Sequence, residues 1–318
     1  MRLHRLRGVA VLVLALTTVL VAAPSCRSVA HRSAQRSVAG SGAPSAAPSG
    51  ELTARGGHKL LVILLENHSG AEAMRSMPNL RYWAHRFGQA SDYHAVGHPS
   101  LPNYLAIWGG STFGVSSDCS VGASGCRPVA PTVFSQTIAA GRTARAYQES
   151  MTQRCQTATA GRYAARHGPW PYWLGAHERS LCRANDVPAG TTGRGALVHD
   201  IRTGALPVTG ELTPDFCNDG HDCPLSTADR WLRRWVSVLR AGSDWRYGRL
   251  TIVITFDEDD YSAANKVAFV VLDPRLSHTV VRRACDHYCL TRWLDENARV
   301  RLLRHAASAP DLRAAFHL

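Results

Sequence analysis

The chain has 318 residues, of which 45% are hydrophobic, and this is enough apolar material for a sizeable core in one large domain or two small ones. Its formal net charge is +12, carried almost entirely by arginine, and a charge of this sign favours anionic partners. The arginines are scattered, and no basic run with interleaved aromatic residues and no nucleic-acid-binding motif occurs. These features argue against a nucleic-acid-binding protein and leave phosphorylated substrates or anionic lipids as candidate partners.

The first 56 residues predict export rather than a folded domain. Residues 1–25 combine a basic start, an apolar stretch and small residues, which is the pattern of a secretory signal peptide. Residues 26–56 are rich in Ser, Ala, Gly and Pro and predict a flexible linker. Cys26 follows a sequence that weakly resembles a lipoprotein box, so the secreted protein is expected to be free or lipid-anchored to the outer face of the cell membrane. We expect residues 57–318 to form the functional domain, as a monomer.

The first predicted strand, residues 60–65, is an apolar run followed directly by Glu66 and Asn67. Such a run is typical of a strand buried on both faces of a parallel sheet, and the two residues after it are potential oxygen ligands. Residues 71–89 then place apolar and aromatic side chains at helical spacing, which predicts a helix packed on the core.

Ser100 lies between two prolines, Pro99 and Pro102, and an apolar run that predicts a helix follows. The prolines stiffen the backbone, and the start of a helix favours an anion. A serine held there can attack phosphorus if a metal or a base lowers its pKa, although a serine in this position more often caps a helix. The local sequence Gly-His-Pro-Ser-Leu is not a GxSxG elbow, which argues against an ordinary α/β-hydrolase esterase.

Two polar segments follow in the middle of the chain. Residues 132–148 predict a helix and then a strand, and residues 161–173 mix Arg162, Arg166 and His167 with aromatic residues. The second segment is either a pocket for an anionic, partly apolar substrate or a packed loop. Residues 174–210 show no clear pattern.

The loop between Cys217 and Cys223 concentrates polar side chains: Asn218, Asp219, His221 and Asp222. A histidine beside carboxylates can carry a proton near neutral pH, although a lone histidine is more often structural. Residues 227–239 then predict an amphipathic helix with Thr227 as its cap.

A second buried strand is predicted before residue 257, and it ends in four acids: Asp257, Glu258, Asp259 and Asp260. In open α/β sheets, chemistry gathers beyond the carboxyl ends of the strands. Packed carboxylates repel one another unless water or a cation intervenes, so the run is either a solvated acidic turn or half of a metal site. If the strand ending at Glu66 lies beside it, the two ends can hold one hard or borderline metal ion.

The rest of the chain predicts another buried strand at residues 267–272 and a helix that opens near His287, which is either catalytic or packed. Eight cysteines follow Cys26, and an even set in an exported chain indicates disulfides, although a zinc site is an alternative. The simplest pairing joins sequence neighbours: 119–126, 155–182, 217–223 and 285–289.

Several short sequences occur together in an order that resembles one known family. They are EN at 66–67, HPSLPNYLA at 98–106, YAARHGPW at 163–170, NDGHD at 218–222, ADRWL at 228–232 and DEDD at 257–260. The chain resembles the phosphoesterase family of secreted acid phosphatases and phospholipases C, within the alkaline-phosphatase-like superfamily. The resemblance implies an α/β fold, a three-layer αβα sandwich with a mostly parallel central sheet.

The resemblance also implies roles for particular residues. Ser100 matches the family nucleophile and His221 a histidine needed for activity. The implied metal ligands are Glu66, Asn67, Asp257 and Glu258, for a divalent ion that is calcium, magnesium, manganese or zinc. The implied substrate-binding or supporting residues are His98, Asn103, His167, Asp219, Asp222, Asp259, Asp260 and His287.

These roles predict a secreted metal-dependent phosphomonoesterase, an acid phosphatase acting on phosphoinositides or other phosphorylated small molecules through a phosphoseryl intermediate. The alternatives are a phospholipase C or other phosphodiesterase on the same scaffold, and a surface lipoprotein that binds a ligand without turnover.

Overall fold

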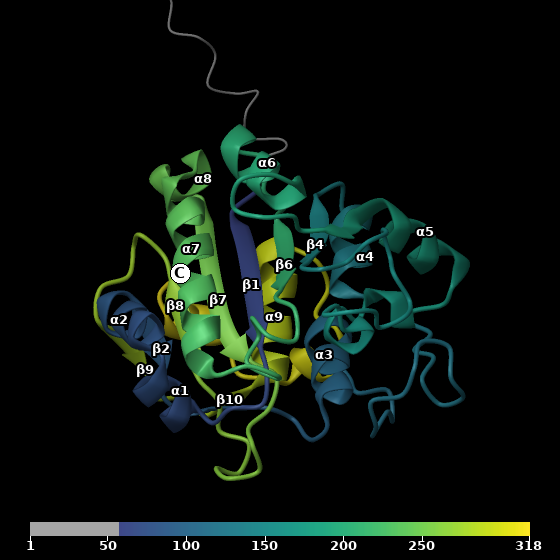
Figure 1. Ribbon diagram of the computed structural model, residues 1–318, viewed down its shortest axis with the longest axis horizontal. Helices are drawn as coiled ribbons and strands as arrows, with labels where there is room; N and C mark the ends of the chain where they lie inside the picture. The colour runs from purple at the N-terminus through teal and green to yellow at the C-terminus, as the bar shows by residue number, and fades with distance from the viewer. Residues whose placement is uncertain (1–56) are drawn as a thin grey trace, which may run out of the picture. The chain divides into compact units, whose positions relative to one another are not determined.

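An eight-stranded, mostly parallel sheet forms the centre of the computed structural model, which describes residues 57–318 (Figure 1). The predicted signal peptide and linker lie outside the described residues. The strands run in the order β5-β4-β6-β1-β7-β8-β2-β9, and β3 pairs with β10 in a separate two-stranded sheet. The strands are β1 (Lys59–Leu65), β2 (Gly88–Ala90), β3 (Tyr93–His94), β4 (Ala144–Gln148), β5 (Asp186–Pro188), β6 (Thr209–Thr213), β7 (Leu250–Phe256), β8 (Phe269–Leu272), β9 (Thr279–Val281) and β10 (Cys285–Asp286).

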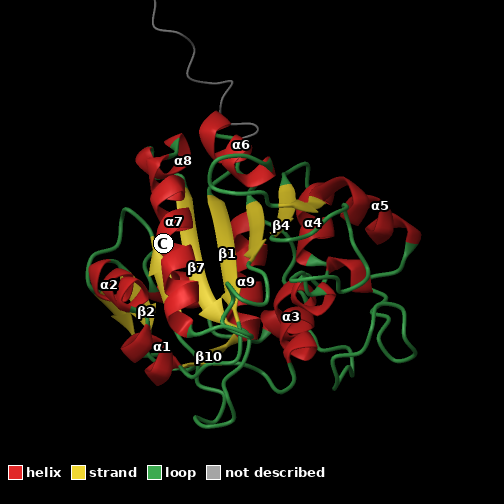
Figure 2. Ribbon diagram, in the orientation of Figure 1, coloured by secondary structure: helices red, strands yellow, loops and turns green. Residues whose placement is uncertain are grey.

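Helices cover both faces of this sheet, so the predicted three-layer αβα sandwich is confirmed. Helix α7 lies in front of the sheet and α9 behind it, with α2 packed on α7 and with α3 and α4 packed on α9 (Figure 2). The helices are α1 (Gly70–Ser76), α2 (Pro78–Arg86), α3 (Ser100–Gly109), α4 (Val133–Ala139), α5 (Ala176–Asn185), α6 (Ala196–Thr203), α7 (Leu225–Ala241), α8 (Ser243–Arg246), α9 (His287–Ala298) and α10 (Leu312–Ala315), with 3₁₀ turns η1 (Ala165–His167), η2 (Trp170–Tyr172) and η3 (Arg304–Ala307).

Strands β1 and β7 are parallel neighbours at the centre of the sheet, and every residue in both is buried. Their register runs from Lys59 opposite Leu250 to Leu65 opposite Phe256, so both strands end at the same level. Burial of each aliphatic side chain stabilises the folded state by about 1.5–3 kcal/mol, so the many buried side chains of β1 and β7 stabilise this central pair of strands. The carboxyl edge, meaning the edge of the sheet at which β1 and β7 end, therefore carries the residues that follow both strands.

Two local predictions differ from the structure, and one segment without a prediction proves to be regular. The helix predicted at 71–89 is two helices, because Pro78 restricts the residue before it and starts α2 at its own position. Helix α7 begins at Leu225, and its N-cap is Pro224, three residues before the predicted cap Thr227. Residues 174–210, which show no clear sequence pattern, contain α5, β5 and α6.

The described chain contains four disulfides, and they join the sequence neighbours as predicted: Cys119–Cys126, Cys155–Cys182, Cys217–Cys223 and Cys285–Cys289. Within residues 57–318, none of the helices combines the length and the hydropathy needed to cross a membrane.

Two buried carboxyl groups lie on one face of the sheet, outside the carboxyl-edge cluster. Asp186 of β5 and Glu211 of β6 are both aligned with Ala146 of β4, and neither has any exposed surface. The Gln148 side-chain amide donates a hydrogen bond to Glu211 Oε2 at 3.3 Å. Burial raises the pKa of both carboxyl groups well above the ordinary range, and the charge of Asp186 raises the pKa of Glu211 further.

This pair predicts that Glu211→Gln makes the folded protein less sensitive to rising pH. Because the pKa of Glu211 is higher in the folded state than in the unfolded chain, its stabilising contribution is present at low pH. It is lost as the pH rises above the unfolded value of about 4.3. Urea unfolding measures the free energy of unfolding at pH 5 and at pH 8. The decrease between these two pH values should be smaller in Glu211→Gln than in wild type, and an equal decrease in both proteins contradicts the prediction.

Candidate active site

The candidate active site lies at the carboxyl edge of the sheet, where the ends of β1 and β7 meet the first turn of α3 (Figure 1). Glu66 follows β1 and Asp257 follows β7, so the register of the strands puts these two acids side by side. The Asp257 backbone N–H donates to the carbonyl of Leu65 at 2.9 Å, and the Asn67 backbone N–H donates to Asp257 Oδ1 at 3.2 Å. Local backbone geometry therefore fixes the predicted pairing of the strand ends.

Ser100 is the first residue of α3, and its side chain is only 3% exposed. Its Oγ donates a hydrogen bond to Glu66 Oε2 at 2.9 Å. The Ser100 hydroxyl also lowers the pKa of the nearby Asp257 carboxyl group, against the larger effect of burial. The N-cap position of the helix belongs to Pro99, so Ser100 does not cap the helix. The structure thus brings the predicted nucleophile onto the acids that follow the two central strands.

The acids at the carboxyl edge are buried close to one another, and neither lysine of the chain pairs with them: Lys59 pairs with Asp244 and Lys266 with Asp92. Burial raises the pKa of Asp257 to about 7, and burial and the charge of Asp257 raise the pKa of Glu258 to about 9. Burial, followed by the charges of Asp257 and Asp219, raises the pKa of Glu66 well above its ordinary range. A cluster of this kind favours either protons or a cation, because its ionised form is otherwise uncompensated.

The donor set fits a divalent cation. Asp257 Oδ2 is buried and has no hydrogen-bond partner among the described residues, so one ligand oxygen at the centre of the cluster is unused. Glu66 accepts the hydrogen bond of Ser100, while Glu258 Oε2 lies 3.1 Å from His98 Nδ1. Carboxylate and amide oxygens are ligands of calcium, magnesium and manganese.

A tighter group of potential ligands lies elsewhere. Among the described residues, Cys155, Cys182 and Asp186 place their ligand atoms within 4.8 Å of one another, a spacing that no three acids or histidines at the carboxyl edge reach. The two cysteines are joined as a disulfide, so their sulfur atoms are not free thiolates. This group is therefore a weaker metal candidate than the wider set beside Ser100.

His167 lies inside the site rather than on its rim. Its ring bridges two acids, with Nδ1 at 3.1 Å from Asp219 Oδ2 and Nε2 at 3.3 Å from Glu66 Oε1. Burial and the positive charge of Arg166 hold its pKa well below the ordinary range, so the imidazole is neutral. The Glu66 backbone N–H also donates to the Asp219 carbonyl at 3.0 Å, which ties the loop after β6 to the end of β1.

His221 is at the more open side of the same loop. Its Nδ1 lies 2.7 Å from Asp222 Oδ1, and its backbone N–H donates to Asp219 Oδ1 at 2.8 Å. Gly220 has a φ of 101°, a conformation that favours glycine, and this turn directs the chain from Asp219 to His221. The Cys217–Cys223 disulfide spans the loop.

Arg166 and Asp118 are two further polar residues at the site; the sequence indicates Arg166 only as part of a possible pocket segment and does not single out Asp118. The Arg166 guanidinium lies 3.1 Å from His221 Nε2, and its Nε lies 3.2 Å from Asp118 Oδ2. Asp118 Oδ1 accepts the backbone N–H of Leu101, so the pair reaches the first turn of α3. The mixture of basic and aromatic residues at 161–173 is a signal for Arg166, whereas Asp118 lies in a sequence without a distinguishing pattern.

Two other predicted residues, Asn103 and His287, hold the backbone next to Ser100 and Asp257 through hydrogen bonds. Asn103 Oδ1 accepts the backbone N–H groups of Val96 and Gly97, at 3.0 and 3.2 Å, and so braces the loop before Ser100. His287 is fully buried, and its Nε2 lies 2.6 Å from the carbonyl oxygen of Asp257. Burial lowers the pKa of His287 to about 4.

The last two acids of the DEDD run differ in their surroundings. Asp259 is buried and lies 3.2 Å from His98 Nε2. Asp260 is exposed, and its carboxylate accepts a hydrogen bond from the Ser262 hydroxyl. The structure therefore brings Asp259 to the site and leaves Asp260 on the surface of the loop.

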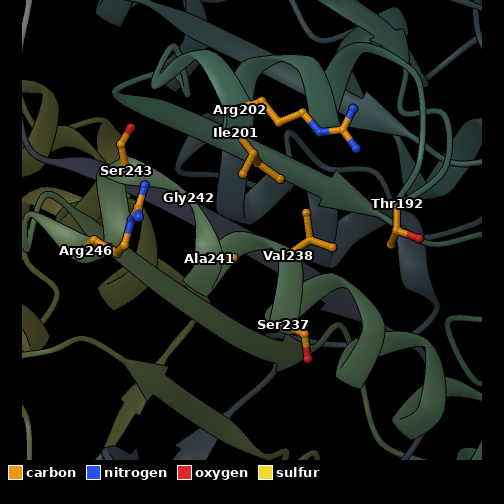
Figure 3. A pocket seen from close by; sticks show the side chains of 9 residues that line it. All are labelled: Thr192, Ile201, Arg202, Ser237, Val238, Ala241, Gly242, Ser243 and Arg246. Carbon is orange, nitrogen blue, oxygen red and sulfur yellow. The ribbon is translucent and has the colours of Figure 1, made fainter.

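A cavity of about 440 Å³ lies among α6, the end of α7 and α8 (Figure 3). Its lining includes Ile201, Val238 and the guanidinium-bearing Arg202 and Arg246. These helices lie at the end of the sheet opposite the carboxyl edge (Figure 1), so this cavity is separate from Ser100.

The fold and the site together define a three-layer α/β protein that sets a serine hydroxyl among acids at the carboxyl edge of its sheet. The chain belongs to the Phosphoesterase family, whose model matches residues 72–267. It is therefore a hydrolase of phosphate ester bonds. The matched segment contains Ser100, His221 and Asp257, whereas Glu66 and Asn67 precede it.

Relatives with curated names agree with this assignment. A phosphatidylinositol-3-phosphatase of Mycobacterium tuberculosis is 26% identical over 264 residues, covering 80% of this chain and 81% of the relative. An acid phosphatase of Aspergillus fumigatus is 28% identical over 225 residues, but the match spans about half of its length (48%). In fold alone, the chain is similar to the lipoteichoic acid synthase LtaP from Listeria monocytogenes, with a TM-score of 0.53 at 8% identity, over 81% of this chain and 76% of that one.

Proposed function

We propose that the protein is a metal-dependent phosphomonoesterase in which Ser100 is the nucleophile. The observation that carries the proposal is the position of the Ser100 hydroxyl, 2.9 Å from Glu66 Oε2 inside a cluster of buried acids at the carboxyl edge. A general hydrogen-bonding role for Ser100 does not require several buried acids at the same edge of the sheet, because burying unpaired carboxylates is unfavourable. A nucleophile that must lose its proton and face a phosphate does require charge to be arranged around it.

Each residue of the site has a separate role in the proposed hydrolysis. Glu66 and Asp257 orient the Ser100 oxygen, which attacks phosphorus and forms a phosphoseryl group that water then hydrolyses. Arg166 is the cation placed to attract the phosphate, and His221 protonates the leaving oxygen or binds a phosphate oxygen. A divalent cation bound by Glu66, Asn67, Asp257 and Glu258 would supply the positive charge that lowers the pKa of the hydroxyl and balances the charge of the phosphate.

The proposed substrates are phosphate monoesters of small molecules, including phosphoinositides. Support comes from the similarity to a phosphatidylinositol-3-phosphatase and to fungal acid phosphatases, and from the net charge of +12, which favours anionic substrates.

Paired ester assays test this substrate class. p-Nitrophenyl phosphate is expected to be hydrolysed much faster than bis-p-nitrophenyl phosphate or phosphatidylcholine. The opposite order would assign the chain to the phosphodiesterases or phospholipases C. Absence of turnover on all three, with metal supplied, would support a binding protein instead.

We further propose that residues 57–318 are the catalytic domain of an exported protein whose signal peptide is residues 1–25 and whose linker is residues 26–56. Four disulfides in the described chain support an oxidising destination. Mass spectrometry of the N-terminal peptide of the exported protein tests cleavage near residue 25 and any lipid on Cys26.

A further inference from the structure

Tyr261 is an exposed aromatic residue beside the candidate active site. Its side chain is 76% exposed, and its ring stacks on the imidazole of His98 with ring centroids 3.8 Å apart and planes 17° apart. His98 precedes Ser100 by two residues and is itself held between Glu258 Oε2 and Asp259 Oδ1, at 3.1 and 3.2 Å. The tyrosine ring is therefore positioned by groups that belong to the catalytic cluster, while most of its surface faces solvent.

The loop that carries Tyr261, residues 259–265, is held by hydrogen bonds within the loop and to the segment before Ser100. The Asp259 carboxylate accepts the backbone N–H groups of Tyr261, Ala263 and Asn265 at 2.8, 2.7 and 3.0 Å. The Asn265 side chain donates to the Gly97 carbonyl at 2.9 Å, which joins this loop to the segment before Ser100. The loop therefore holds the ring in one place relative to the nucleophile.

Packing in the hydrophobic core does not explain why residue 261 is a tyrosine, because its side chain is mostly exposed. Tyr261 has a φ of 65°, in the left-handed region that is unfavourable for a residue with a Cβ, and it contributes little to the core. An exposed aromatic ring that is fixed at the rim of a site offers a flat apolar surface to a ligand at a low entropic cost, because few of its torsions remain to be frozen.

We propose that Tyr261, backed by His98, forms a leaving-group subsite that binds the ring of phosphate esters with a cyclic leaving group. The subsite rests on the proposed phosphatase function and narrows it to a substrate class. An aryl ring can stack on the tyrosine, and a saturated ring can place its C–H face against it. The exposed area is that of one side chain, which matches one ring rather than an extended acyl chain.

Substitutions at Tyr261 test the subsite with two simple esters, phenyl phosphate and glycerol 3-phosphate. The ratio of their kcat/KM values is expected to fall about fivefold in Tyr261→Ala, mainly through a higher KM for phenyl phosphate, and to be retained in Tyr261→Phe. Tyr261→Leu keeps apolar bulk without the aromatic face and is expected to lose the preference as alanine does. Tyr82→Ala is the matched control, since Tyr82 is 58% exposed on α2, and its ratio should equal that of wild type.

The outcomes separate the subsite from the enzyme activity itself. If wild type hydrolyses neither ester, the proposed phosphatase function fails. If wild type is active and Tyr261→Ala keeps the wild-type ratio, the subsite is overturned while the phosphatase remains. An equal loss on both esters also overturns it, because the residue then supports the loop rather than the leaving group. Competitive inhibition by phenol and by glycerol measures ring binding without turnover, and only inhibition by phenol should weaken in Tyr261→Ala.

Discussion

Replacing Ser100 by alanine is expected to abolish phosphate ester hydrolysis, with a loss of at least about 10⁴-fold in kcat, because the variant lacks the hydroxyl that is proposed to accept the phosphoryl group. The fold should be little affected. The hydroxyl donates a hydrogen bond to Glu66, and a single buried hydrogen bond contributes about 1 kcal/mol to the free energy of unfolding. Thermal melting should therefore change by only a few degrees, and rapid acid quench followed by mass spectrometry should detect phosphoserine at residue 100 in wild type alone.

Ser135 provides the matched control for this experiment. It is also a buried serine, but it belongs to the capping box of α4, where its hydroxyl hydrogen-bonds with Thr132. Ser135→Ala should lower the melting temperature through loss of the cap and should leave turnover near the wild-type value. Wild-type turnover in Ser100→Ala would remove the serine from the mechanism, and phosphate found on a different residue would identify its replacement.

The centre of the fold was predictable because its signals are local and strong. Strands β1 and β7 are apolar runs that end in acids, and a parallel sheet brings such ends together when the two strands are neighbours, as they are here. The position of Ser100 at the start of α3 follows in the same way from a proline-bounded turn and an apolar run. The sequence could thus place Glu66 and Asp257 at one edge of the sheet, and the resemblance to the phosphoesterase family added Ser100 to them.

Residues that meet through long-range packing were less predictable. Arg166 reaches His221 and Asp118 across about 50 residues in each direction, and no spacing rule links such positions. Tyr261 follows the DEDD run directly, but its stacking on His98 depends on hydrogen bonds that cross between two loops. The sequence of residues 174–210 mixes glycine, arginine and short apolar stretches, so the helices and strand there depend on packing against their neighbours.

Removing divalent metal should abolish activity and destabilise the protein, and adding it back should restore both. Ligand binding to the folded state stabilises it by about 2.7 kcal/mol at a concentration 100 times the Kd, so metal-free protein should melt several degrees below protein with saturating metal. Oxygen donors predict that magnesium, calcium or manganese restores activity, and zinc is the alternative to be tested with them. Differential scanning fluorimetry after chelation, with each metal added singly, measures the stabilisation without depending on turnover.

Asp257→Asn should remove most of this metal-dependent rise in melting temperature, because it exchanges a central charged ligand for a neutral one. Asp222→Asn serves as the control. Asp222 is an acid on the outer side of the His221 loop, 2.7 Å from the imidazole, and is not among the four proposed ligands. Its variant should keep the full metal-dependent rise. If the melting temperature of Asp257→Asn still rises with metal as in wild type, then the ion that stabilises the fold is bound elsewhere, and the charge that activates Ser100 must have another source.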